Sequence, residues 1–332
     1  MTFDPDAPAE GDGLFGLPYT PEQAAVVVIP VPFEATASYR RGTKDAPTAI
    51  LEASRQVDLH DIETGDPWTA GLAMEPVDPR VVAWEDAASE DSVVVIANGG
   101  RDPGDPERCA RVDAIMRQLN DHVEARTRHW LEQGRIPAIL GGDHSVPLGA
   151  IKAASERFPG LGVLHVDAHA DLRVAYEGFE FSHASILYNV SRLPGVAAIA
   201  QVGIRDFGRA EREYSESSTK IETWFQANVA WQLAGGASWR KLCEDIVRPL
   251  PKDLWITFDI DGLNPDLCPE TGTPVPGGLT WEQALVLLRT VGESGRRIVG
   301  FDLNEVGNAE WDAIVGARLL YKLAGWALAT RP

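Results

Sequence analysis

The sequence predicts a single α/β domain built on a parallel sheet that helices cover on both faces. Short runs of β-branched and aliphatic residues, typical of buried strands, alternate along the chain with longer segments of helical periodicity. No internal repeat or linker divides the 332 residues, and the chain is long enough to bury a large core. We expect one domain over residues 23–332, preceded by a loose, Pro- and Gly-rich arm over residues 1–22.

The candidate strands are short and strongly apolar, as in a sheet buried on both faces. The first of them has the sequence AAVVVIPV, and another, SVVVIA, is equally β-branched. Between them, residues 62–90 are rich in Pro, Asp and Gly and are expected to form a surface excursion. The candidate strands are 24–31, 56–60, 92–97, 136–140, 161–166, 197–204, 254–260 and 297–303.

The candidate helices show apolar residues at a spacing of three to four. The longest spans 105–133, with Gly134 as a plausible stop. Ser145 is placed to cap the helix that follows the strand at 136–140. The candidate helices are 48–57, 105–133, 146–157, 239–247, 280–291 and 311–327.

The composition indicates a soluble protein of a reducing compartment. A formal net charge of −19 argues against nucleic-acid binding and is compatible with a small cationic ligand. No apolar run is long enough to span a bilayer and no signal pattern opens the chain, so we expect a cytoplasmic protein without a membrane partner. Cys109, Cys243 and Cys268 lie far apart and predict neither a disulfide framework nor a zinc knuckle.

Four of the candidate strands end in residues that carry chemistry. Because the carboxyl ends of parallel strands share one edge of the sheet, where ligands bind, these side chains are expected to lie together. The residues are Asp143 and His144 after Leu140, Asp167, His169 and Asp171 after Val166, Asp259 and Asp261 after Phe258, and Asn304 and Glu305 after Leu303.

With Asp143 left aside, the first three strand ends supply two imidazoles and four carboxylates. Carboxylates packed together repel one another unless cations neutralise them. Oxygen donors with one or two imidazoles suit Mn²⁺ better than zinc, and six ligands fit two ions that share carboxylates. Singly, an Asp-x-Asp pair is usually a loop feature and His144 a core histidine; their joint occurrence favours a metal site. His165 is interpreted as a core histidine or a hydrogen-bond partner of a ligand.

Several longer motifs resemble those of the ureohydrolases, the arginase and agmatinase family. Together they extend from about residue 25 to about residue 327, in the order found in that family. The motifs are VPFEATASYRRGTKDAPTAI (31–50), GGDHS (141–145), DAHAD (167–171), SHAS (182–185), DIDGLNPDLCPETGTPVPGGLT (259–280) and FDLNEV (301–306). The resemblance implies a three-layer α/β/α fold with a central, mainly parallel eight-stranded sheet, two Mn²⁺ ions with Ni²⁺ as an alternative, and a homo-oligomer (trimer or hexamer).

The resemblance also implies the role of each site residue. His144, Asp167, Asp171 and Asp259 would hold one ion, and His169, Asp167, Asp259 and Asp261 the other. Hydroxide held between the ions would attack the guanidinium carbon, and urea and an amine would leave. Asp171 would handle the proton, His183 would shuttle it, and Glu305 would anchor the guanidinium group of a small cationic substrate.

The loops indicate an agmatinase-like branch of the family. Arginases commonly carry an SGN-type segment before the shuttle histidine, whereas this chain has EFSH (180–183). Ala46 and Ala184 replace glycines that are usual in the family, and Tyr176, Phe179 and Phe181 are candidates to shape the pocket. We expect the loops 172–181 and 205–235 to select the substrate. Agmatine, converted to putrescine and urea, is the leading expectation; free guanidine, guanidinobutyrate, guanidinopropionate and arginine are alternatives.

Two functions of other classes stay open on the sequence alone. A metallophosphoesterase also uses paired metals, but that chemistry expects a GNH[DE] segment and more histidines than the seven present. A non-catalytic homologous subunit would normally have lost some of the six ligands, and all six are present.

Overall fold

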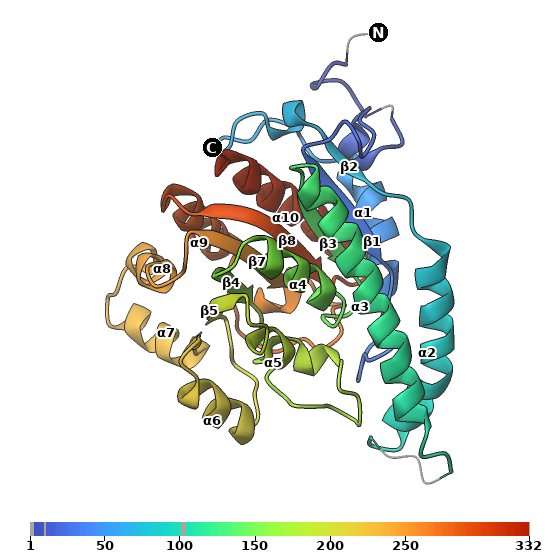
Figure 1. Cartoon of the computed structure of the whole chain (residues 1–332). Helices are drawn as coiled ribbons and strands as arrows, with labels where there is room; N and C mark the ends of the chain where they lie inside the picture. The colour runs from blue at the N-terminus through green and yellow to red at the C-terminus, as the bar shows by residue number, and fades with distance from the viewer. Residues whose placement is uncertain (1–2, 10, 101–103, 332) are drawn as a thin grey trace.

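The computed structural model describes residues 3–9, 11–100 and 104–331. Eight strands form one all-parallel sheet in the order β2-β1-β3-β8-β7-β4-β5-β6, which confirms the expected fold class (Figure 1). The strands are β1 Val26–Val31, β2 Leu72–Met74, β3 Ile136–Gly141, β4 Leu161–Val166, β5 Val196–Val202, β6 Ile221–Trp224, β7 Asp253–Asp259 and β8 Arg297–Asn304.

Alternate side chains of the strands serve two separate apolar cores, one on each face of the sheet. In β1, Val26 and Val28 join the core under α1, α8, α9 and α10, whereas Val27 and Ile29 join the core under α2 to α5. Both faces are therefore buried, which explains the uninterrupted apolar strands. The helices are α1 Ala46–Ser54, α2 Pro79–Ala97, α3 Arg108–Glu132, α4 Leu148–Arg157, α5 Ile186–Ser191, α6 Arg209–Ser217, α7 Gln226–Ala234, α8 Trp239–Val247, α9 Trp281–Glu293 and α10 Glu310–Ala329.

Two of the expected strands are wrong. Residues 92–97 form the last turns of α2, and residues 56–60 are turn and coil. Within α2, Ser92 and Val95 are buried while Val93 is 48% exposed, which is the three-residue spacing of a helix. The short edge strands β2 and β6 take the places of the two missing strands in the sheet. The expected surface excursion at 62–90 contains β2 and the first half of α2.

Ser145 does not cap α4, because the helix begins after Pro147. The backbone N–H of Ser145 instead donates to Asp143 Oδ1 at 3.0 Å, and the hydroxyl group bonds the same oxygen. Asp143 thereby closes the turn between β3 and α4. The expected stop of α3 at Gly134 is confirmed: the helix ends at Glu132, and Gly134 has a φ of 70°.

Part of the N-terminal segment packs on the domain. Leu14, Phe15 and Leu17 are buried, and the Phe15 ring lies 4.8 Å from the Tyr321 ring of α10. The Phe15 N–H donates to Ser54 Oγ at 2.8 Å, so this turn is anchored to α1 as well. Residues 14–17 thus differ from a loose arm. Among the helices of the described residues, none combines the length and apolarity needed to cross a membrane.

Candidate metal centre

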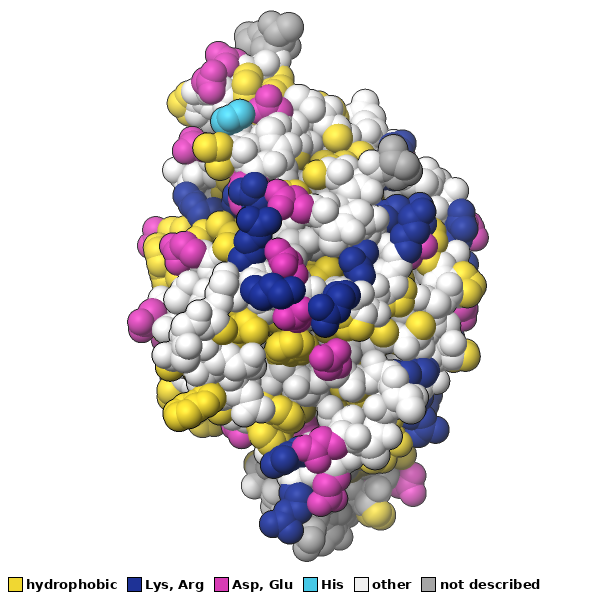
Figure 2. All heavy atoms as spheres, turned by 90° about the vertical axis from the view of Figure 1, so that its left-hand side faces the viewer, with side chains coloured by type: hydrophobic (Ala, Val, Ile, Leu, Met, Phe, Trp, Pro, Cys, Tyr) yellow, Lys and Arg dark blue, Asp and Glu magenta, His cyan; other side chains and the backbone are white. Residues whose placement is uncertain are grey.

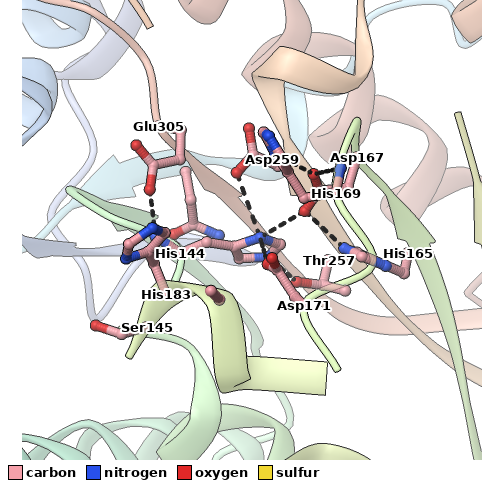
Figure 3. Close-up of polar contacts among 12 residues, drawn as sticks. His144, Ser145, His165, Asp167, His169, Asp171, His183, Thr257, Asp259 and Glu305 are labelled. Atoms are coloured by element: carbon pink, nitrogen blue, oxygen red, sulfur yellow. Dashed lines mark hydrogen bonds and ion pairs between the residues drawn. The ribbon is translucent and has the colours of Figure 1, made fainter. Parts of the chain in front are cut away.

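The residues of the candidate site come from four strands that are neighbours in the middle of the sheet. The order β3-β8-β7-β4 places the ends of these strands side by side at one edge. Each strand is largely apolar until that edge, where the chain turns and presents polar groups to the site. His144, Asp167, Asp259 and Glu305 follow or end the four strands and approach one another there (Figure 3).

Three carboxylates surround one ring nitrogen of His144. Nδ1 lies 3.0 Å from Asp167 Oδ2, 3.3 Å from Asp171 Oδ2 and 3.4 Å from Asp259 Oδ2. The four residues that we expect to hold one metal ion therefore converge on a single point.

A second group forms around His169. Its Nδ1 lies 3.0 Å from Asp261 Oδ2 and 3.4 Å from Asp167 Oδ1. Asp167 thus directs one oxygen to each group, as a bridging ligand would. Asp259 is linked to the second group by a hydrogen bond to the backbone: its Oδ1 accepts the Asp261 N–H at 2.8 Å. All six expected ligands lie in this one cluster.

The electrostatics of the cluster suit cations. The four carboxylates are buried, with at most 4% of each residue exposed. Burial and the nearby Asp261 and Asp167 raise the pKa of Asp259 well above its usual value. Burial and Asp167 raise the pKa of Asp171 to about 8. Carboxylates with such pKa values bind protons unless another positive charge replaces them, so the donor set fits divalent metal ions.

His144 is oriented from behind by a chain of hydrogen bonds. Its Nε2 lies 2.9 Å from Thr257 Oγ1, and that hydroxyl donates to Asp302 Oδ1 at 2.8 Å. Since the Thr257 hydroxyl group donates to Asp302, its Oγ1 accepts a hydrogen bond from the Nε2–H group of His144. Burial opposes charge on His144, but the hydrogen bonds to Asp167, Asp171 and Asp259 raise its pKa well above the usual value, so Nδ1 donates to these carboxylates here. A metal ion would replace that proton and accept the lone pair of Nδ1. Thr257 and Asp302 were not predicted from the sequence, although Asp302 lies inside the FDLNEV motif.

His165 is buried and forms a hydrogen bond with one of the expected ligands, Asp167. Gln201 Nε2 donates to its Nδ1 at 3.0 Å, and its Nε2 lies 2.8 Å from Asp167 Oδ2. Burial lowers the pKa of His165, so the ring is neutral and donates to Asp167 through Nε2. His165, which belongs to β4, therefore orients the Asp167 carboxylate.

His183 is held by the loop that follows β1. Its backbone N–H donates to Thr36 Oγ1 at 3.0 Å, and Thr36 Oγ1 donates to Asp143 Oδ2 at 2.8 Å. Nε2 of the ring lies 3.4 Å from Ser38 Oγ. Burial lowers the pKa of His183, which leaves the ring neutral and able to accept a proton. Thr36 and Ser38, which lie in the TAS segment of the motif at 31–50, were not predicted from the sequence.

Glu305 lies beside His144, and one of its two carboxylate oxygens accepts a hydrogen bond from the backbone of His144. Oε1 accepts the His144 N–H at 2.9 Å, while Oε2 has no hydrogen-bond partner among the described residues. A Cβ atom at Gly272 would lie 2.6 Å from Oε2, so only glycine leaves this oxygen room. Glu305 and Asp171 both have positive φ, 60° and 53°, a strained conformation that often occurs at functional sites.

A cavity of about 270 Å³ opens onto the cluster. His169, Asp171 and His183 form part of its wall, whereas Glu305 does not line it. Of the aromatic residues expected to shape it, Tyr176 does so, but Phe179 is buried in the core and Phe181 packs at the side of α3 under Arg117. The other lining residues that bear polar or ring groups are Ser38, Tyr39, Arg173, Asp206, Phe207, Glu211 and Thr273.

Comparisons with known proteins agree with this geometry. The model of the arginase family matches residues 24–325. An N(1)-aminopropylagmatine ureohydrolase of Thermus thermophilus is 33% identical over 94% of each chain. An agmatinase of Bacillus subtilis is 28% identical over 86% of this chain and 84% of its own.

Solved structures share the fold over nearly the whole chain. A hypothetical agmatinase from Burkholderia thailandensis has a TM-score of 0.74 at 25% identity and covers 98% of this chain and 92% of its own. The arginase of Bacillus caldovelox, at 20% identity, has a TM-score of 0.70, with 91% and 98% covered. The chain therefore belongs to the arginase family and is a ureohydrolase, a hydrolase of amidine carbon–nitrogen bonds.

Proposed function

We propose that this ureohydrolase holds two divalent cations, Mn²⁺ or alternatively Ni²⁺, and hydrolyses a small cationic guanidinium compound to urea and an amine. The observation that carries the proposal is the convergence of four buried carboxylates and two imidazoles at one edge of the sheet. His144, Asp167, Asp171 and Asp259 would hold one ion, and His169, Asp167, Asp259 and Asp261 the other. Such ions lower the pKa of water and so supply a nucleophile at neutral pH.

The protein's own groups would bind the substrate and move its proton. Glu305 Oε2 has no other partner among the described residues and can accept N–H groups of the guanidinium ion, which favours a charged, planar donor. Asp171, whose pKa burial and Asp167 raise to about 8, can hold a proton close to the leaving nitrogen. Neutral His183 lines the cavity and would carry protons between this centre and solvent.

Agmatine is the substrate that we place first, with putrescine as its product. The EFSH segment supports an amine rather than an amino acid, and relatives named agmatinase extend over most of the chain. N(1)-aminopropylagmatine is the second candidate, because relatives that carry its name are up to 33% identical to this chain. The exposed Asp206 lines the cavity and forms no ion pair with a described residue, so it is available to attract a distal amine. We also propose a cytoplasmic homo-oligomer.

A panel assay tests this proposal directly. Urea release from agmatine and N(1)-aminopropylagmatine, with Mn²⁺ or Ni²⁺ supplied, is expected to exceed that from arginine, guanidine, guanidinobutyrate and guanidinopropionate. The readout is kcat/KM for each compound. Faster hydrolysis of arginine would contradict the substrate class. Absence of urea from every compound would support a non-catalytic subunit, and phosphate release from a generic ester would support a phosphoesterase.

Replacing Thr257 by valine is expected to weaken metal binding about 10- to 100-fold, because His144 Nε2 then loses the acceptor that fixes its ring. Metal dissociation constants from competition with a chelator measure the effect. Thr257→Ser keeps the hydroxyl group and serves as the matched control. Equal metal affinity in the valine variant would show that Thr257 does not orient His144.

A further inference from the structure

We propose that the chain binds a small tetrahedral oxyanion of the phosphate class at the edge of the sheet opposite the metal centre. Four arginines line a cavity of about 160 Å³ there: Arg135, Arg157, Arg297 and Arg331. Arg135 immediately precedes β3 and Arg297 begins β8, while the other ends of these two strands lead to His144 and Glu305. The two sites therefore lie at opposite ends of the same strands.

The charge around this cavity is opposite to that of the chain, whose net charge is −19. Arg297 pairs with Asp253 at 2.8 Å. Among the described residues, no carboxylate lies within 4.0 Å of the guanidinium groups of Arg135, Arg157 or Arg331. Figure 2 views the molecule from the left-hand side of Figure 1 and shows Lys and Arg side chains interspersed with Asp and Glu side chains on that face. Four arginines against one carboxylate leave a local excess of positive charge.

The arginines are held in place by contacts that leave donors unused. Arg135 Nη2 donates to the Glu22 carbonyl oxygen at 2.7 Å, but its buried Nε has no partner among the described residues. Arg331 donates to the carbonyl oxygen of Gly134. Arg157 forms no hydrogen bond or ion pair with a described residue, and its guanidinium lies 5.2 Å from the Phe158 ring. Arg297 lies 4.9 Å from the same ring. Phe158 thus supports two cations: all the N–H groups of Arg157 are left for a ligand, whereas Arg297 uses its Nε–H on Asp253 and keeps its terminal N–H groups.

The cations of this site repel one another. Burial, together with the nearby Arg135 and Arg297, lowers the pKa of Arg331. An anion would remove this repulsion and accept the free N–H groups, and the planar guanidinium fork matches the geometry of phosphate oxygens. The cavity is smaller than the roughly 300–1,000 Å³ of pockets for drug-sized ligands, which indicates a small ion and not a nucleotide.

Thermal unfolding of the metal-loaded, full-length protein tests the site, with inorganic phosphate and sulfate as probes against sodium chloride at equal ionic strength. A ligand that binds only the folded state at 100 times its Kd raises Tm by about 4 °C for a chain of this length. We expect this shift for both tetrahedral anions, and titration calorimetry is expected to give a Kd that rises at least about 10-fold in Arg157→Gln.

Arg157→Gln is the decisive variant because the Arg157 side chain forms no hydrogen bond that the fold requires. Arg240→Gln, an exposed arginine of α8 outside this cavity, is the matched control and is expected to keep the full shift. Equal anion affinity in Arg157→Gln and in the control would place phosphate elsewhere, for example at the metal ions, and would overturn the proposal. A Tm shift no larger than with chloride would equally overturn it. Neither result depends on urea release.

Discussion

Asp259→Ala is expected to abolish metal binding and urea release together, with kcat/KM lowered by about 10³-fold or more. Asp259 Oδ2 lies 3.4 Å from His144 Nδ1, and Oδ1 accepts the Asp261 N–H. Alanine would remove a shared ligand and also free the turn that presents Asp261. Both proposed ions would lose support, so excess metal should not restore activity.

Metal content after gel filtration and urea release are the two measurements. Asp266→Ala is the matched control, because this exposed aspartate lies in the loop after β7 and its carboxylate forms no hydrogen bond or ion pair with a described residue. The control is expected to keep both metal and activity. An Asp259→Ala protein that turns over agmatine at the normal rate would contradict the binuclear proposal, whereas normal metal content without activity would confine Asp259 to a catalytic role.

Much of the fold followed from the sequence because the central strands are continuous apolar runs between turn residues. Val26 to Val31 and Leu161 to Val166 are buried on both faces, and such runs clearly indicate strands. The prediction of a strand at SVVVIA (92–97) was wrong because a short apolar segment does not distinguish a strand from a half-buried helix. Its N-terminal signal was present: Asp78 accepts the Arg80 N–H at 2.9 Å, with Pro79 in the first turn of α2. The strands β2 and β6 are too short to carry a pattern.

The candidate ligands could be predicted because each follows an apolar strand directly. How closely they approach one another depends on the order of the strands in the sheet. The residue pattern does not reveal that β8 lies between β3 and β7. The supporting residues were not predicted for a related reason. Thr36 and Asp143 are 107 residues apart, and Thr257 and Asp302 are 45 apart. A hydroxyl group in a strand or loop has no periodicity that reveals such a distant partner.

Glu305→Gln is expected to fold and bind metal normally but to lower kcat/KM for guanidinium substrates about 10- to 100-fold, mainly through KM. The amide keeps an oxygen that accepts the His144 N–H, and its nearly identical volume still fits against Gly272. The substitution changes the other carboxylate oxygen: an NH₂ group replaces Oε2 and repels the N–H donors of the guanidinium substrate. Glu270→Gln, an exposed glutamate of the loop that contacts Arg40, is the control and should leave KM unchanged. Glu305 does not line the cavity in this structure. Unchanged kinetics in Glu305→Gln would therefore show that Glu305 does not anchor the guanidinium group, and the proposed metal ligands would be unaffected by that result.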